Sequence, residues 1–167
     1  MDMAPEHSRG SLAELAIKIF QDAYRLQMAG DIDLAADLYR RSIEIHPTAE
    51  AHTYLGFAYR HQGRLEDAIV ECKRAIAVDP GFGNPYNDIG AYLIELGRSE
   101  DAIPWLEKAT HSARYESYQF PWYNLGRVYT AKEMYRKASE CFQNALDIEP
   151  DYEAAQKAFD RFRRSIQ

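Results

Sequence analysis

Small and bulky apolar residues follow the same order four times along this chain, with charged and polar residues between them. The clearest markers are four alanines, Ala35, Ala68, Ala102 and Ala138, which lie 33, 34 and 36 positions apart. Repeats of this length are typical of chains in which each copy is one supersecondary unit stacked on the next. The pattern therefore predicts an all-α protein built from internal repeats.

Each copy is predicted to form two antiparallel helices. A second set of small residues, present in every copy, would let the two helices approach closely while Leu, Tyr and Phe fill the surrounding space; this set is Ala23, Gly56, Gly90 and Gly126. A glycine follows the first helix in three copies, where a helix end tolerates a positive φ; these glycines are Gly30, Gly63 and Gly97. Glu133 stands at that place in the fourth copy, which makes its turn a departure from the pattern.

The two ends of the chain carry their own signals. Ser11-Leu12-Ala13-Glu14 has the form of a capping box, which predicts that the first helix begins near Leu12 and that residues 1–10 form a flexible tail. After Pro150, apolar residues continue at helical spacing. A final helix over 152–167 is therefore expected to cover the fourth copy.

The fourth copy resembles a tetratricopeptide repeat (TPR) at every position of that motif. The matching residues are Trp122, Leu125, Gly126, Tyr129, Ala138, Phe142 and Pro150. The resemblance implies a right-handed superhelix of about nine antiparallel helices. The region 11–151 would hold the four repeats, at about 16–48, 49–82, 83–118 and 119–152. The helix over 152–167 would cap them.

The resemblance also implies where a partner would bind. In the TPR family, the first helices of the repeats form a concave face, and set positions on them contact ligands. The residues at those positions that we select as partner-binding candidates are Phe20, Tyr24, Phe57, Arg60, Asn87, Tyr123 and Arg127. Aromatic side chains and hydrogen-bonding groups are the types that an extended peptide needs. We therefore expect a scaffold or adaptor that binds a peptide or partner protein; the alternative is a structural protein that assembles into a homo-oligomer.

The third repeat carries two extra residues in the stretch Thr110 to Phe120, which includes Tyr115 and Tyr118. An aromatic insertion of this kind suits a partner-binding loop. A longer helix whose tyrosines pack over Trp122 is the alternative, and it is favoured.

Charge and composition narrow the partners and exclude several chemistries. The formal net charge of −6 disfavours nucleic acid as a partner, and the lack of a long apolar run disfavours membrane insertion. Cys72 and Cys141 are far apart and lack zinc-site spacing, which fits a reducing, cytoplasmic setting. No catalytic signature is recognised, so neither an enzyme nor a cofactor or metal site is expected.

Overall fold

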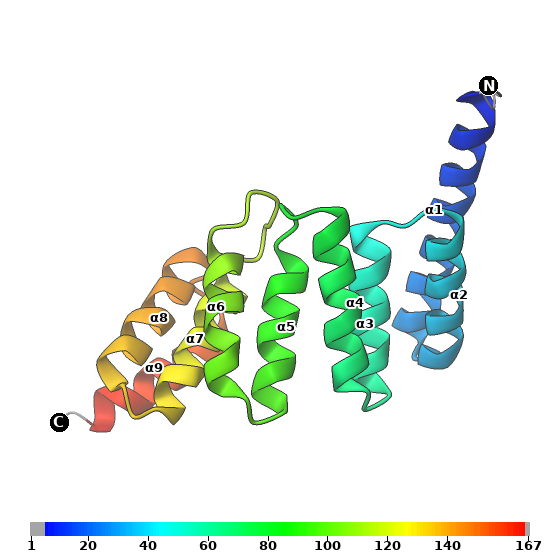
Figure 1. Cartoon of the computed structure of the whole chain (residues 1–167). Coiled ribbons are helices and arrows are strands. Elements are labelled where there is room, and N and C mark those ends of the chain that lie inside the picture. Colours follow the sequence, from blue (N-terminus) through cyan, green and yellow to red (C-terminus); the bar gives the residue numbers. More distant parts are fainter. Residues whose placement is uncertain (1–5, 166–167) are drawn as a thin grey trace. The chain divides into compact units, whose positions relative to one another are not determined.

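The computed structural model describes the backbone of residues 6–165 and the side chains of residues 10–162. This part of the chain forms nine α-helices and no β-strand, which confirms the all-α prediction (Figure 1). The helices are α1 (Glu6–Ala29), α2 (Ile32–Ile45), α3 (Ala49–His61), α4 (Leu65–Val78), α5 (Asn84–Glu95), α6 (Ser99–Thr110), α7 (Gln119–Ala131), α8 (Tyr135–Ile148) and α9 (Glu153–Ser165).

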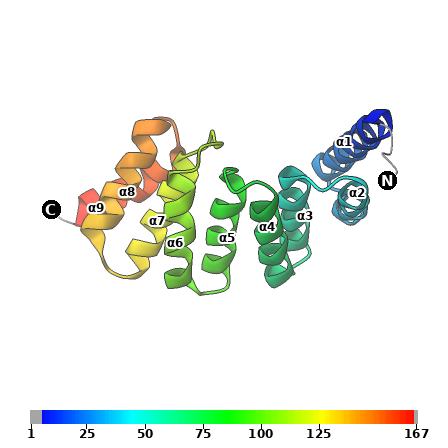
Figure 2. The same cartoon turned by 45° about the horizontal axis from the view of Figure 1, so that its top comes forward.

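The helices fall into two compact units, an N-terminal unit that ends at Pro80 and a C-terminal unit that begins at Gly81. In the N-terminal unit, α1 pairs with α2, α3 pairs with α4, and α2 packs on α3. In the C-terminal unit, α5 to α9 pack in chain order (Figure 2). Helix α5 also contacts α7. The length of the chain predicts one folded unit, whereas the structure has two. Repeats that contact only their neighbours do not form a single central core.

Small residues bring the two helices of each pair together, as predicted. The four marker alanines, Ala35, Ala68, Ala102 and Ala138, have no exposed surface. A Cβ atom added to Gly126 would lie 2.4 Å from Cε1 of Phe142, and one added to Gly90 would lie 2.4 Å from Cδ2 of Leu106. The glycine on the first helix therefore leaves the space that a bulky side chain of the second helix fills.

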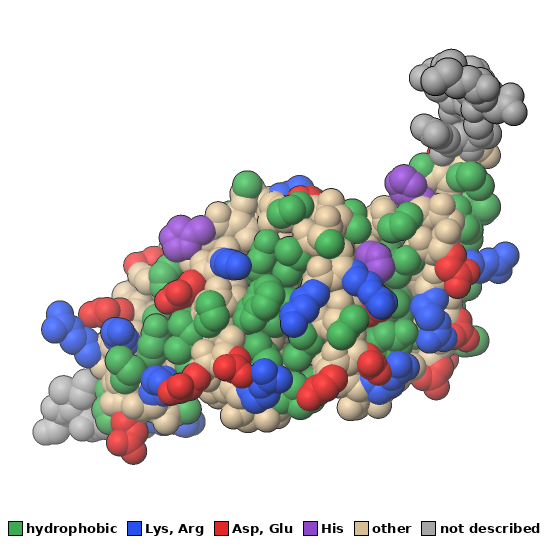
Figure 3. Space-filling model, in the orientation of Figure 1, with side chains coloured by type: hydrophobic (Ala, Val, Ile, Leu, Met, Phe, Trp, Pro, Cys, Tyr) green, Lys and Arg blue, Asp and Glu red, His purple; other side chains and the backbone are tan. Residues whose placement is uncertain are grey.

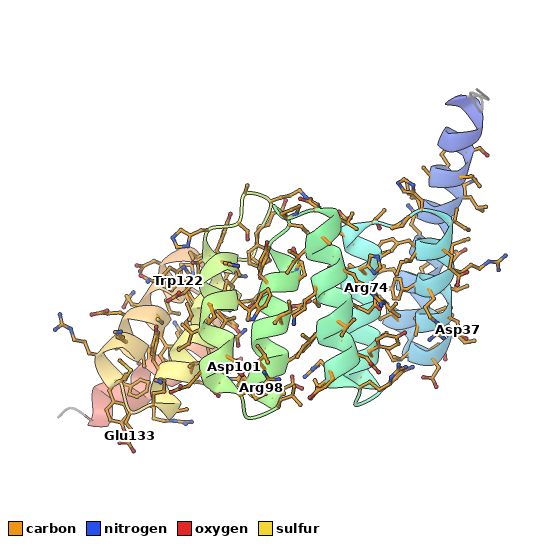
Figure 4. All side chains as sticks on the ribbon, viewed as in Figure 1. Asp37, Arg74, Arg98, Asp101, Trp122 and Glu133 are labelled. Carbon is orange, nitrogen blue, oxygen red and sulfur yellow. The ribbon has the colours of Figure 1, made fainter. Side chains whose placement is uncertain are left out.

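The N-terminal unit also buries hydrogen-bonded polar groups. Ser42 on α2 donates from its hydroxyl to the carbonyl oxygen of Ala16 on α1, at 2.8 Å. His52 on α3 places Nδ1 2.7 Å from Oε2 of Glu71 on α4, and Arg74, labelled in Figure 4, pairs with the other oxygen of Glu71. Since burying an unpaired polar group is costly, these bonds tie α1 to α2 and α3 to α4 at fixed points.

The four turns inside the helix pairs share one backbone structure. In the last pair, the amide of Glu133 donates to the carbonyl oxygen of Thr130 and that of Met134 to the carbonyl oxygen of Tyr129, which is a Schellman motif. Glu133 has φ 58°, in the left-handed region, and Gly97 has φ 75° at the same place in the preceding pair. Glu133 thus takes the conformation of the glycines despite its side chain (Figure 4).

The first helix begins earlier than the capping box predicts. Helix α1 starts at Glu6 and continues through Ser11, so the predicted start at Leu12 is wrong and residues 6–10 belong to the helix rather than to a tail. A sequence that begins with a glutamate suits a helix start, because negative charge is favoured near the N-terminal end of a helix dipole. Residues 1–5 of the expected tail, and 166–167 of the expected last helix, lie outside the described residues.

The stretch Thr110 to Phe120 is an ordered loop rather than a longer helix. Helix α6 ends at Thr110, and the amide of Arg114 donates to the carbonyl oxygen of Gly81 while its own carbonyl accepts from Gly83. Tyr115 is buried against Gly83, where a Cβ atom would lie 2.5 Å from Tyr115 Cβ. The favoured prediction of a longer helix over Trp122 is therefore wrong, because the loop pairs with the segment before α5.

We predict that Gly126→Ala lowers the free energy of unfolding by about 1–3 kcal/mol, because Phe142 is buried among aromatic rings and cannot move aside. Urea unfolding followed by circular dichroism measures the loss. Gly10→Ala is the matched control, since a Cβ atom there meets nothing within 4 Å and its higher helix propensity should slightly stabilise α1. Equal effects of the two changes would contradict the packing argument.

We predict that Glu133→Gly raises the free energy of unfolding by about 0.5–1 kcal/mol, since relief of the left-handed conformation outweighs the added flexibility of the unfolded chain. Thermal and urea unfolding report the change. The reverse substitution at the equivalent turn, Gly97→Glu, should destabilise. A Glu133→Gly protein that is no more stable than the wild type would show that the turn is unstrained.

Candidate functional site

Two of the predicted site residues, Phe20 and Tyr24 on α1, belong to an aromatic cluster in the N-terminal unit. The ring centroid of Phe20 lies 5.4 Å from that of Tyr54 on α3 and 5.5 Å from that of Tyr39 on α2, while Tyr24 lies 5.6 Å from Tyr54. Tilted and edge-to-face rings at these distances stabilise the packing of the helices. Phe20 is half-buried, whereas Tyr24 keeps 40% of its surface exposed and forms the accessible edge of the cluster.

Phe57 and Arg60 lie about one turn apart on α3 and are both half-buried. The ring of Phe57 lies 4.4 Å from that of His61, one turn further along the same helix. Phe57 therefore packs along its own helix as well as presenting part of its ring to solvent.

Asn87, predicted as a ligand contact, lies inside the C-terminal unit. It is 8% exposed, and its Oδ1 accepts a hydrogen bond from Nδ2 of Asn124 at 3.0 Å. Asn124 in turn accepts from Nη1 of Arg127 at 3.2 Å. These bonds connect α5 to α7 and hold the Arg127 guanidinium. Asn87 therefore helps to position Arg127 through Asn124 and is not itself an exposed contact residue.

Tyr123 and Arg127 line a cavity between α7, α8 and α9, which we call the α7–α9 pocket. Its volume is about 550 Å³, within the usual range for ligand sites. The lining residues are Tyr123, Arg127, Thr130, Ala131, Phe142, Ala154, Lys157, Ala158, Arg161 and Phe162. The structure thus brings these two predicted residues together at one hollow of the C-terminal unit.

Aromatic rings form the apolar wall of the α7–α9 pocket. The ring of Phe142 stacks on Phe162 with centroids 5.8 Å apart, and Tyr123 packs against Phe142 at 5.8 Å. Tyr152 lies 5.2 Å from Tyr123, and its burial raises the pKa of its hydroxyl, an effect that the nearby Arg127 opposes. Tyr152 lies outside the pocket lining, next to Tyr123, and its hydroxyl stays neutral near neutral pH.

Three cationic side chains, Arg127, Lys157 and Arg161, line the same pocket, and the lining contains no acidic residue. Arg127 and Arg161 are exposed, as is Lys157, which forms an ion pair with Glu153 one turn earlier on α9. The sequence analysis does not identify Lys157, Arg161 and Phe162, because the ligand positions of the family lie on the four repeats and the last helix is expected only to cap them. The apolar spacing of that helix is the one feature of the sequence that indicates a packed face there.

A second hollow of about 440 Å³ lies at the turns of the N-terminal unit, lined by residues 30–34 together with His61 and Gln62. Gln62 donates from Nε2 to Oδ1 of Asp33 at 2.7 Å. Its lining contains no Phe, Tyr or Trp, so this hollow lacks the aromatic wall of the α7–α9 pocket.

Nucleophilic and metal chemistry find little support in the described side chains. Cys72 and Cys141 are buried and not joined in a disulfide, and burial raises the pKa of the Cys141 thiol to about 11, so that thiol is protonated and unreactive near neutral pH. Among the described residues, no group of three or more His, Cys, Asp or Glu is placed to hold a metal ion. No helix in this part of the chain combines the length and apolar character needed to cross a bilayer.

The repeats match a known family. The tetratricopeptide repeat family matches residues 49–82, 84–114 and 121–152, which together cover more than half of the chain. Human tetratricopeptide repeat protein 29 is 32% identical over 123 residues, 68% of this chain and 26% of that protein. The probable UDP-N-acetylglucosamine–peptide N-acetylglucosaminyltransferase SPINDLY of Hordeum vulgare is 28% identical over 66% of this chain and 12% of that protein.

This chain therefore spans about a quarter of the first relative and about an eighth of the second. A solved structure of Pseudomonas aeruginosa PilF aligns with a TM-score of 0.85 over 95% of this chain and 70% of that chain, at 22% identity, and so supports the fold alone. The repeat spacing, the helix pairs and the family matches agree. The chain belongs to the tetratricopeptide repeat family.

Proposed function

We propose that this chain is a non-catalytic cytoplasmic adaptor that binds a peptide or a segment of a partner protein in the α7–α9 pocket. The observation that carries the proposal is the meeting of Tyr123 and Arg127, both predicted as partner contacts, at the wall of one cavity. TPR proteins generally act as scaffolds for protein partners. The pocket supplies what such a segment needs, an apolar wall for a side chain and hydrogen-bond donors beside it.

Support for an adaptor rather than an enzyme comes from the chemistry of the pocket. Its lining holds no cysteine, histidine or carboxylate that could act as a nucleophile or a general base. Cys72 and Cys141 are not joined in a disulfide, which suits a reducing compartment, where thiols persist.

We predict that Ala131→Trp abolishes peptide binding. Ala131 lies at the end of α7 and is exposed while lining the pocket, so an indole there fills the cavity without entering the core. Peptides selected from a random library on the wild type would be titrated by fluorescence anisotropy. Gln143→Trp, an exposed site on α8 outside the pocket lining, is the control and should bind as the wild type does. Full binding by Ala131→Trp would place the site elsewhere.

A second candidate is self-assembly, which is favoured by apolar side chains left exposed in the N-terminal unit. Ile17 and Met28 on α1 are 51% and 60% exposed, and Leu34 on α2 is 56% exposed. These side chains would be removed from water if another copy of the chain covered them, which would favour association.

The self-assembly candidate predicts a mass that rises with protein concentration in light scattering. Met28→Glu together with Leu34→Glu should then return the chain to a monomer while leaving its helical content unchanged. A wild type that keeps the mass of one chain at high concentration would eliminate this candidate and leave the adaptor function unaffected.

A further inference from the structure

We propose that the α7–α9 pocket selects an acidic peptide segment, one in which a bulky apolar side chain is flanked by carboxylates. This inference rests on the proposed function and adds the chemistry of the partner. The apolar side chain would pack against Phe142 and Phe162, and the carboxylates would meet Arg127, Lys157 and Arg161.

The charge of the pocket is opposite in sign to that of the chain. The whole chain has a formal net charge of −6, and acidic and basic side chains are mixed over the face drawn in Figure 3. The pocket lining departs from that mixture, since its three charged residues are all cations. Clustered cations beside a low-dielectric wall attract carboxylates more strongly than the same cations scattered over a surface.

The two cations on α9 lie on one face of the helix. Lys157 and Arg161 are four residues apart, which places them one above the other beside the pocket. The ion pair between Lys157 and Glu153 involves side chains that are 71% and 76% exposed. Because an exposed pair of this type contributes little, a ligand carboxylate can share Lys157 at small cost.

The third cation is held in place from the interior. Arg127 donates to Asn124, which donates to the buried Asn87. A guanidinium whose position is fixed before binding loses less conformational freedom when a carboxylate arrives. Arg127 therefore provides a preorganised contact on the side of the pocket formed by α7.

A peptide fits these features better than nucleic acid or a lipid surface does. A cavity of about 550 Å³ with an aromatic wall suits one or two apolar side chains, whereas binding to a polyanion requires a row of cations along its phosphates. The net negative charge of the chain also repels an extended polyanion. A short acidic segment needs only the cations at the pocket, and its few charges are repelled less by the rest of the chain than those of a polyanion.

The test uses three fluorescein-labelled peptides of equal length, each with a central leucine flanked by glutamate, glutamine or lysine. We expect the glutamate peptide to bind the wild type most tightly and to lose affinity as salt increases. Arg161→Glu should weaken the glutamate peptide about five- to tenfold and leave the glutamine peptide nearly unchanged. The variant should fold, because a glutamate there can pair with Lys157 one turn away.

The matched control is Arg136→Glu on α8, which changes the net charge equally at a site that is 94% exposed and outside the pocket lining. It should bind the glutamate peptide as the wild type does. An equal loss in both variants would mean that net charge, and not the pocket, sets the preference, and would overturn the inference.

The remaining outcomes separate this inference from the proposed function. If the three peptides bind equally and only Ala131→Trp abolishes binding, the acidic preference is wrong and the adaptor function stands. If Ala131→Trp leaves the binding of every peptide intact, both are wrong. Tighter, Arg161-dependent binding of single-stranded oligonucleotide or of vesicles with anionic lipid would overturn the peptide assignment.

Discussion

The close approach of paired helices at small residues is the constraint on which the rest of this structure depends. Each pair buries an alanine of its second helix completely, and in the second half of the chain a glycine on the first helix leaves room for a large side chain opposite. At Gly126 the occupant is Phe142, whose ring also lines the α7–α9 pocket and stacks on Phe162. The residue that closes the helix pair thus also provides the wall of the candidate site, so the repeat motif and the pocket share one packing arrangement.

Buried polar groups add fixed points to this packing. Ser42, His52 and Glu71 make hydrogen bonds between helices in the N-terminal unit, and Asn87 and Asn124 do so in the C-terminal unit. Such bonds contribute modestly when made but are expensive to break in the interior. In the C-terminal unit the same bonds extend to Arg127 at the pocket. Interior polar packing therefore positions a surface cation, and the candidate site depends on α5 although α5 does not line it.

The sequence predicts the helix pairs and their small contacts well, because these depend on residues within one repeat. The family resemblance selects Tyr123 and Arg127, which are four residues apart and so lie one turn apart on α7. The sequence does not predict the earlier start at Glu6, because a capping box inside a longer helix looks the same as one at its start. Three further features depend on residues from different repeats and so cannot be predicted from one repeat. They are the loop that buries Tyr115 against Gly83, the burial of Asn87, and the positions of Lys157 and Arg161 in the pocket lining. The contribution of the last helix to the pocket lining emerges only when α9 is placed against α7 and α8.

Nuclear magnetic resonance tests directly whether the α7–α9 pocket is where this chain receives a partner. Amide chemical shifts of the ¹⁵N-labelled chain would be followed while an acidic, leucine-containing peptide is added. If the peptide binds there, we expect the largest shifts around Tyr123, Arg127 and Ala158, with saturation at one peptide per chain. Shifts centred instead on α1 and α2, with the pocket residues unchanged, would contradict binding at the pocket.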